Sequence, residues 1–317
     1  KSYGAISRYP DPYGKKLKEA LAGRHGMTPA EVLVGNGSTQ LIYLLCAAAR
    51  PRNTLIVGPA FSEYANALRL GGANIRQFAL TADSGFLFSM PRFMAAWEKD
   101  CDMVFLATPN SVTGRLIPRA DIESIAPSAL MRKSFVVVDE AFIDFVEAES
   151  VKALVRQNPY LIVLRSLTKV YALPGLRLGY LFGAARTVGE LAAYQEPWSV
   201  NAPALSVALA CLEDKGFTTK TECWLEKERR FLSRRLEAVR GLPPFPSQTN
   251  FLLVKIDRNG FDALQLRSFL ARNKILIRAC DSFAELGVEY FRIAVRRRKD
   301  NLRLLAALKE WSGSSIG

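Results

Sequence analysis

Runs of β-branched and aromatic residues alternate with amphipathic stretches along the first two hundred residues of the chain. The runs are almost continuously apolar, which is typical of strands covered on both faces. Stretches 62–72 and 119–131 between them have helical periodicity. The predicted strands are TLIVGP (54–59), NIRQFAL (74–80), MVFLATP (103–109), SFVVVDEA (134–141), LIVLRSL (161–167) and RLGYLFG (177–183). This alternation predicts an α/β fold with a mostly parallel central sheet.

The pattern changes after Pro203. A long helical stretch, 203–240, is followed by a Pro-rich turn, GLPPFPS. The later elements are a strand at 251–256, a helix at 261–273, strands at 275–280 and 290–295, and a helix at 300–311. We therefore expect a large domain at 15–200 and a smaller C-terminal α+β domain, with its linking helix, at 201–317.

Composition excludes two classes of protein. Hydrophobic residues make up 49% of the 317 residues, so a wholly disordered chain is excluded. The longest apolar run, Leu41–Ala49, is far shorter than the roughly 18 residues that span a bilayer, so no membrane partner is expected. The opening segment KSYGAISRYPDPYG has no apolar core, so no secretory signal is expected.

Cysteine and histidine usage narrows the chemistry. Five cysteines without a CxxC pair argue against a disulfide framework and a cysteine-rich zinc site, so we expect reduced thiols and a cytoplasmic location. The sole histidine, His25, excludes a multi-histidine metal site and disfavours a Ser-His-Asp triad. No bound metal is therefore expected. His25 stands in a turn, GRHGMTP, and we expect it on the surface.

The formal net charge of +13 raises the question of an anionic partner. Basic residues are dispersed, and the only tight run is RRRK at 296–299, which is typical of a solvated face. We therefore expect no nucleic-acid partner and favour attraction of a small anionic substrate.

Candidate chemistry follows the predicted strands, because open parallel sheets bind ligands beyond the carboxyl ends of their strands. Gly35 to Thr39 precede an apolar helix and form either a phosphate cradle or an ordinary helix cap. Asp139 ends a strand and is either a structural cap or ion pair, or the partner of a cationic ligand atom. Lys169 is either a surface lysine or a Schiff-base amine with a lowered pKa.

These segments together, in this order, resemble the fold-type-I enzymes that depend on pyridoxal 5'-phosphate (PLP). The resemblance covers nearly the whole chain, from RYPDPY at 8–13 to FRIAVR at 291–296. Within this group the chain resembles the histidinol-phosphate aminotransferases and, more closely, the L-threonine-O-3-phosphate decarboxylases. The segments that carry the likeness are DEAFIDF (139–145), LRSLTKVYALPGLRLGYL (164–181), PWSVN (197–201) and ILIRAC (275–280).

The resemblance implies the PLP-dependent transferase fold and a set of site residues. Lys169 would bind PLP covalently, and Asp139 would pair with the ring nitrogen and keep it protonated. The other implied cofactor-binding residues are Gly37, Ser38, Thr39, Phe61, Asn110, Ser111, Phe142, Ser166, Thr168 and Arg177. Among them, Phe61 would stack on the ring, and Ser166 and Arg177 would hold the phosphate together with the amides of Ser38 and Thr39.

The resemblance also implies a substrate pocket and a homodimer. Arg292 matches an arginine for the substrate carboxylate and Arg278 one for a substrate phosphate, while Asn201 would line the same pocket. Residues 1–14 would form a dimer-contact arm from which Tyr9 reaches the PLP phosphate of the neighbouring subunit. From the resemblance we expect the family segment that precedes this arm to be missing or truncated.

Two residues depart from the aminotransferase pattern. Relatives read PNNPTG where this chain reads PNSVTG, so Ser111 replaces an asparagine that bonds the ring oxygen. Asn110 is a candidate to compensate. Phe142 stands where aminotransferases have a tyrosine that donates to the same oxygen, and the decarboxylase pattern shares this phenylalanine.

The expected reaction is the decarboxylation of L-threonine O-3-phosphate to (R)-1-amino-2-propanol O-2-phosphate for cobalamin biosynthesis. The first alternative is a histidinol-phosphate-type aminotransferase, which uses the same residues and requires an oxo-acid. A more distant alternative is a basic protein that kept the fold, lost catalysis and associates with nucleic acid.

Overall fold

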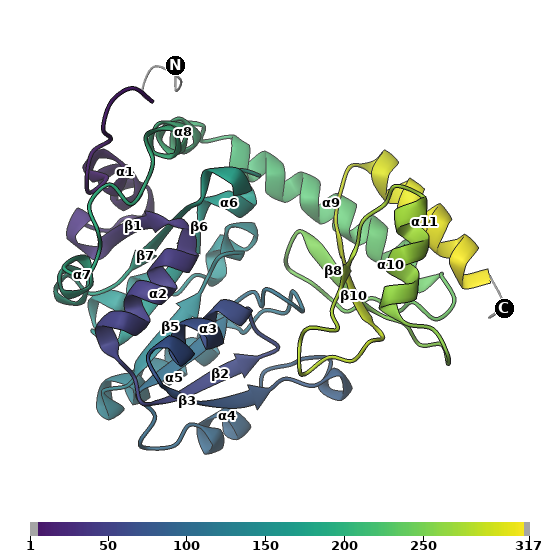
Figure 1. Cartoon of the computed structure of the whole chain (residues 1–317), viewed down its shortest axis with the longest axis horizontal. Coiled ribbons are helices and arrows are strands. Elements are labelled where there is room, and N and C mark those ends of the chain that lie inside the picture. Colours follow the sequence, from purple (N-terminus) through teal and green to yellow (C-terminus); the bar gives the residue numbers. More distant parts are fainter. Residues whose placement is uncertain (1–5, 314–317) are drawn as a thin grey trace.

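The computed structural model describes residues 6–313, which form a larger part around one sheet and a smaller part around another (Figure 1). The strands are β1 Val32–Asn36, β2 Asn53–Gly58, β3 Asn74–Ala79, β4 Met103–Ala107, β5 Phe135–Asp139, β6 Leu161–Ser166, β7 Leu178–Phe182, β8 Phe251–Lys255, β9 Arg278–Ala279 and β10 Tyr290–Ala294. The α-helices are α1 Lys15–His25, α2 Gly37–Ala49, α3 Ser62–Leu70, α4 Met90–Ala96, α5 Arg119–Arg132, α6 Leu167–Val170, α7 Ala185–Ala192, α8 Ala202–Glu213, α9 Phe217–Glu237, α10 Ala263–Arg272 and α11 Arg298–Gly313.

The central sheet has the strand order β1-β7-β6-β5-β4-β2-β3. Strands β2 to β6 are mutually parallel, and β7 pairs antiparallel with both β6 and the edge strand β1. The prediction of an α/β fold with a mostly parallel sheet is therefore confirmed. All six predicted strands are present, whereas β1 was not predicted.

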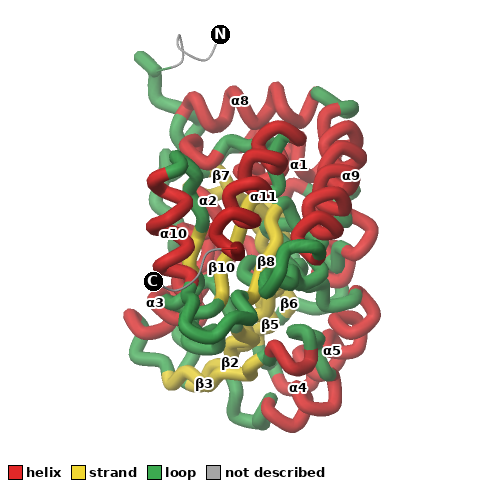
Figure 2. Tube along the Cα trace, turned by 90° about the vertical axis from the view of Figure 1, so that its right-hand side faces the viewer, coloured by secondary structure: helices red, strands yellow, loops and turns green. Residues whose placement is uncertain are grey.

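Helices cover both faces of this sheet (Figure 2). Alternate strand residues such as Phe105, Val137 and Leu164 pack with α2, α3 and α7 in one apolar cluster. The intervening residues, such as Val104 and Val138, face the opposite side and pack with α1, α4 and α5. Since successive strand residues point to opposite faces, strands buried on both sides must be apolar throughout, as the sequence pattern indicated.

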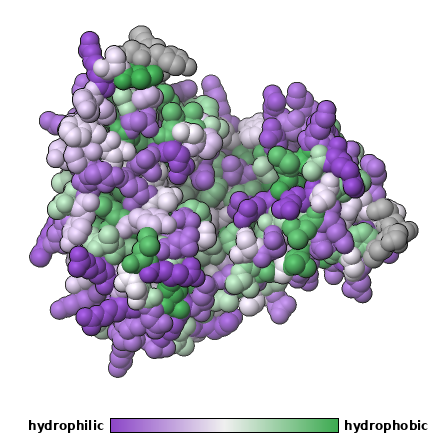
Figure 3. All heavy atoms as spheres, viewed as in Figure 1, coloured by the Kyte–Doolittle hydropathy of each residue, from purple (hydrophilic) through white to green (hydrophobic). Residues whose placement is uncertain are grey.

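The smaller part is a three-stranded antiparallel sheet, β8-β10-β9, together with α10 and α11. Its apolar residues, including Leu252 and Phe291, belong to the same buried cluster as the second face of the central sheet. The helical stretch predicted at 203–240 is two helices, because Asp214–Gly216 interrupts it. Helix α9 runs from the larger part to the smaller one, and the surface is notched between them (Figures 1 and 3).

Candidate active site

The predicted site residues gather where the parallel strands end. Asp139 is the last residue of β5, Ser166 is the last residue of β6, and the two strands are paired in parallel. Asp139 and Ser166 share a sheet face with Leu164, since alternate residues point the same way. Glu140 and Arg165 face the opposite side. The polar residues at the strand ends therefore lie on two sides of the sheet. We call the side of Asp139 and Ser166 the ligand face and the side of Glu140 and Arg165 the structural face.

The start of α2 has the geometry of an anion cradle. Gly37 has a φ of +75°, and a Cβ there would lie 2.8 Å from a terminal nitrogen of Arg177. Gly179 of β7 lies against the same turn, where a Cβ would be 2.2 Å from the amide nitrogen of Ser38. The first amides of α2 have no partner within the helix, and its positive dipole end attracts anions. The cradle and the Arg177 guanidinium therefore lie together.

Ser166 and Thr168 add hydroxyl groups beside the lysine. Their side-chain oxygens are 2.7 Å apart, and Ser166 caps the short helix α6. Lys169 lies on this helix. Burial lowers the pKa of Lys169, Asp139 opposes the shift, and the positive charges of Arg292 and Arg177 reinforce it. The predicted cationic and anionic site residues are therefore close enough to influence the charge of this amine.

Asp139 is a buried carboxylate held by two neutral donors. The backbone N–H of Ala141 donates to Oδ1 at 2.8 Å, and the hydroxyl of Tyr64 on α3 donates to Oδ2 at 2.5 Å. Burial raises the pKa of Asp139, while Tyr64, Ala141 and Lys169 oppose this shift. The sequence interpretation missed Tyr64. The only signal was a hydroxyl on the apolar face of the helix SEYANAL, since a buried tyrosine hydroxyl needs a partner.

Aromatic residues lie between the lysine and the arginines of the smaller part. The Lys169 Nζ is 5.3 Å from the centroid of the Phe142 ring, which meets Phe251 edge to face. On the other side, the Arg292 guanidinium carbon is 4.4 Å from the Phe251 centroid. Phe61, at the start of α3, is 37% exposed and meets Tyr64 edge to face.

Arg292 and Arg278 are direct neighbours across β10 and β9. Arg292 donates to the backbone carbonyl of Ser111, which lies after β4 in the larger part. Arg278 is exposed and donates to the hydroxyl of Ser282 at 3.0 Å. No carboxylate forms an ion pair with either arginine within residues 6–313. The pair therefore offers two guanidinium groups to an anionic ligand.

Two predicted site residues have structural partners in this conformation. The Oδ1 of Asn110 accepts the amides of Val112 and Thr113, each at 2.9 Å, and its Nδ2 donates to the Pro59 carbonyl. Asn201 caps α8 by accepting the amide of Ala204 at 2.9 Å. The compensation expected of Asn110 would therefore have to use its remaining Nδ2 proton.

Tyr9 lies apart from the strand ends. Its side chain is 85% exposed and packs only partly on Trp198, with ring centroids 5.3 Å apart. Tyr13 is 63% exposed on the same segment. Residues 1–5 of the predicted arm lie outside the described residues. This exposed aromatic group has the character of a contact surface.

The expectation that His25 lies on the surface is wrong. Its side chain is 6% exposed, and its Nε2 is 3.1 Å from the Tyr180 hydroxyl. It adjoins a buried charge network on the structural face of the sheet, where Arg165 pairs with Glu140 at 2.8 Å and with Glu147 at 2.5 Å. The turn residues around His25 suggested exposure, but the partners of its ring come from distant segments.

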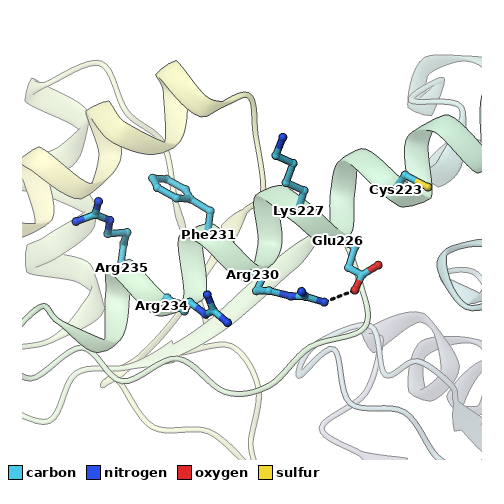
Figure 4. Close-up of a pocket in the computed structure, with 7 residues that line it drawn as sticks. All are labelled: Cys223, Glu226, Lys227, Arg230, Phe231, Arg234 and Arg235. Carbon is cyan, nitrogen blue, oxygen red and sulfur yellow. Dashed lines mark hydrogen bonds and ion pairs between the residues drawn. The ribbon is translucent and has the colours of Figure 1, made fainter.

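A separate hollow of about 490 Å³ lies along one exposed face of α9 (Figure 4). It is lined by Cys223, Glu226, Lys227, Arg230, Phe231, Arg234 and Arg235. Glu226 pairs with Arg230, and no predicted site residue lines the hollow. Among the described residues there is no metal-binding group of three His, Cys, Asp or Glu side chains, and no helix long and apolar enough to cross a membrane.

Comparison with known proteins identifies the family of the chain. The family model "Aminotransferase class I and II" matches residues 1–308. The threonine-phosphate decarboxylase of Salmonella typhimurium is 38% identical over 307 residues, covering 96% of this chain and 83% of that protein.

Two solved structures have the same fold. The histidinol-phosphate aminotransferase from Clostridium acetobutylicum has a TM-score of 0.90 and 25% identity, covering 98% of this chain and 92% of that one. The L-threonine-O-3-phosphate decarboxylase from Porphyromonas gingivalis has a TM-score of 0.86 and 26% identity, covering 98% and 93%.

Proposed function

Because the chain belongs to the aminotransferase class I and II family, we propose that it is a PLP-dependent carboxy-lyase acting on L-threonine O-3-phosphate. The product is (R)-1-amino-2-propanol O-2-phosphate, which places the reaction in cobalamin biosynthesis. The observation that carries this assignment is the 38% identity to a threonine-phosphate decarboxylase over 96% of the chain.

The residues at the strand ends fit PLP. The absence of side chains at Gly37 and Gly179 lets the start of α2, the Arg177 guanidinium and β7 approach closely, so the Ser38 amide and this guanidinium are near enough to bind one phosphate together. Asp139 is a buried carboxyl group that makes no ion pair within the described part of the chain, so its anionic form can pair with a protonated ring nitrogen. Lys169 lies between these two groups in chain order and couples electrostatically to both.

Each residue then has a chemical task. When bound, PLP supplies an electron sink for the pair released as a bond at the substrate Cα breaks. The lowered pKa of Lys169 increases the fraction of its neutral, nucleophilic amine. The Asp139 carboxylate would pair with the ring nitrogen and keep that nitrogen protonated. Once CO₂ has left, the Lys169 Nζ can return a proton to Cα.

The two arginines decide which bond breaks. A Cα bond is activated when it stands perpendicular to the cofactor ring. Arg292 would hold the substrate carboxylate and Arg278 the substrate phosphate, and fixing both anionic ends would determine which Cα bond is activated. Their adjacent places on β10 and β9 support this division of two anionic groups.

The direct test supplies PLP and O-phospho-L-threonine to the purified protein without an oxo-acid. Mass spectrometry then follows the substrate. Appearance of an amine that lacks the mass of CO₂ is the expected result. Unchanged substrate would contradict the proposal.

A second candidate is a histidinol-phosphate-type aminotransferase, favoured by the TM-score of 0.90 to such an enzyme. It differs in requiring an oxo-acid to accept the amino group. Transfer from histidinol phosphate that appears only when 2-oxoglutarate is supplied would identify this activity.

We further propose that the active unit is a homodimer and that Tyr9 reaches the neighbouring site. The exposed aromatic group of Tyr9, Tyr13 and Trp198 supports a contact surface on this segment. An interface that buried these rings would remove apolar surface from water. The cytoplasm is the proposed location, on the odd number of cysteines and the lack of a CxxC pair.

Mixing two inactive variants tests the shared site. Tyr9→Ala and Lys169→Ala subunits, unfolded and refolded together, form mixed dimers in which one site has both residues intact. Random pairing should restore about a quarter of the wild-type activity. A mixture no more active than its components would rule out a Tyr9 that acts across the interface.

A further inference from the structure

Two neighbouring residues of the chain, Asp139 and Glu140, are both buried carboxylates, but they are compensated differently. Glu140 forms an ion pair with Arg165 at 2.8 Å and accepts the Ser150 hydroxyl and the Val151 amide. Among residues 6–313, Asp139 accepts only the Tyr64 hydroxyl and the Ala141 amide. The charge of Glu140 is neutralised within the protein, whereas that of Asp139 is oriented and left unneutralised.

The donor to Asp139 stays neutral. Tyr64 is 0% exposed, and burial, together with the charge of Asp139, raises the pKa of Tyr64 well above its ordinary value. Its hydroxyl therefore keeps its proton and acts as a fixed dipole. A lysine or arginine in this place would form an ion pair and weaken the attraction of Asp139 for a cationic ligand atom.

The ring of Tyr64 is fixed by its neighbours and in turn contacts Phe61. It stacks on Phe105 of β4, with centroids 4.8 Å apart and planes 14° apart. It meets Phe61 edge to face, with centroids 5.9 Å apart and planes at 89°. One side chain thus contacts the carboxylate predicted for the ring nitrogen and the aromatic ring predicted for the cofactor face.

We propose that Tyr64 is a positioning residue that orients the Asp139 carboxylate, preserves its charge for the cofactor's ring nitrogen, and supports Phe61. This inference rests on the proposed PLP-dependent function and deepens it. Without the Tyr64 hydroxyl, Asp139 is a stronger base and draws the ring-nitrogen proton toward itself. The ring then withdraws fewer electrons, so the nitrogen that links PLP to Lys169 keeps its proton to a higher pH.

The test is the absorbance of bound PLP as a function of pH in the Tyr64→Phe protein. This change removes the hydroxyl and keeps the ring that packs on Phe105. The pH midpoint of the absorbance change should rise by roughly one unit, and the dissociation constant of PLP should rise about tenfold. Tyr43→Phe is the matched control, since it also removes a tyrosine hydroxyl that donates to a carboxylate, that of Glu63, at 2.7 Å. It should leave the midpoint unchanged.

A double variant separates positioning from packing. In the Asp139→Asn background, Tyr64→Phe should cause no further shift of the midpoint, because the charge through which Tyr64 acts has been removed. An equal shift in both backgrounds, or none in either, would overturn the proposal. A role confined to packing would lower thermal stability without moving the midpoint.

A measurement without any change at Tyr64 covers the case in which Tyr64→Phe does not fold. The protein without PLP should show a hydroxyl proton far downfield in its NMR spectrum, lost in Asp139→Asn. Lack of this signal in the wild type would contradict the hydrogen bond itself. These readouts need no substrate, so a protein that binds PLP but does not decarboxylate would still test the inference. A wild type that binds no PLP would overturn the proposed function and the inference together.

Discussion

The protonation of the Lys169 amine depends on its burial and on a few charged neighbours. Burial and the positive charges of Arg292 and Arg177 favour the neutral amine, and Asp139 favours the ammonium form. The sequence predicted these residues because each follows a predicted strand or lies in a segment that resembles the PLP-dependent enzymes. Tyr64 could not be predicted in the same way, since its partner Asp139 is 75 residues away and its helix face is otherwise apolar.

Lys169→Ala should remove the lysine-bound absorbance of PLP and lower CO₂ release at least about 10²-fold, because a nucleophile and proton donor is lost. The exposed Lys99→Ala serves as a control and should behave as wild type. Turnover by Lys169→Ala at the wild-type rate would exclude the catalytic role of this residue.

His25 gives the protein a pH dependence at acidic pH. Burial lowers the pKa of His25 from 6.5 to about 4, although Glu147 partly opposes the shift. Below its unfolded pKa the unfolded chain therefore takes up a proton that the folded chain does not. The free energy of unfolding should thus be unaffected by His25 above about pH 6.5 and should fall as the pH drops toward 4.

The His25→Gln variant should remove this loss. Between about pH 7 and 4.5 the wild type should lose roughly 2 kcal/mol relative to the variant. Denaturant unfolding at several pH values measures both proteins, and because His25 is the only histidine, no other imidazole contributes. If the free energies of unfolding of the two proteins depended on pH in the same way, His25 would have the same pKa in the folded and unfolded chains.

At the scale of elements, periodicity predicted the strands that are buried on both faces and the helices between them. It missed β1, a short strand at the edge of the sheet that runs directly into Gly37, the first residue of α2. It also merged α8 and α9, because Asp214–Gly216 is a brief interruption between two helical patterns. The strand expected at 275–280 pairs only at Arg278 and Ala279, since pairing depends on the neighbour β10.

The contact between β7 and the start of α2 depends on Gly179. Gly179→Ala would place a methyl group against the backbone at Ser38, which cannot rotate away as a side chain can. We expect destabilisation by about 1–3 kcal/mol and weaker PLP binding. Thermal unfolding and PLP titration measure the two effects.

Gly189→Ala is the matched control for this substitution. Gly189 lies in α7, and apart from the adjoining backbone of its own helix no heavy atom lies within 4 Å of the position of its Cβ. It should be neutral or slightly stabilising, by up to about 1 kcal/mol, because alanine restricts the unfolded chain. Equal losses of stability and of PLP affinity in the two variants would show that the contact at Gly179 is not required.

Over the whole molecule the positive charge is uneven. Residues 201–317 contain 21 Lys and Arg against 13 Asp and Glu, so this third of the chain carries most of the net charge of +13. The exposed face of α9 with Arg230, Arg234 and Arg235 belongs to this region (Figure 4). The sequence predicted the excess charge and an anionic substrate, and the folded chain adds that three of these arginines line one hollow along α9.

This distribution should draw a phosphorylated amino acid toward the site. At low salt, Arg234→Glu should lower kcat/KM about two- to threefold with kcat unchanged, and the difference should vanish as salt screens the charges. Arg186→Glu makes the same change on α7 in the larger part and should have a smaller effect. Loss of kcat in Arg234→Glu at all salt concentrations would point to a structural defect instead.

The hydrogen bond from Arg292 to the Ser111 carbonyl has a consequence for the order of events in turnover. If Arg292 holds the substrate carboxylate as proposed, that carboxylate replaces the neutral Ser111 carbonyl as its acceptor, and the charge-assisted bond is the stronger of the two. After decarboxylation the product has no carboxylate, and Arg292 can return to the carbonyl. The same exchange that admits the substrate thus promotes departure of the amine, and product inhibition should be weak.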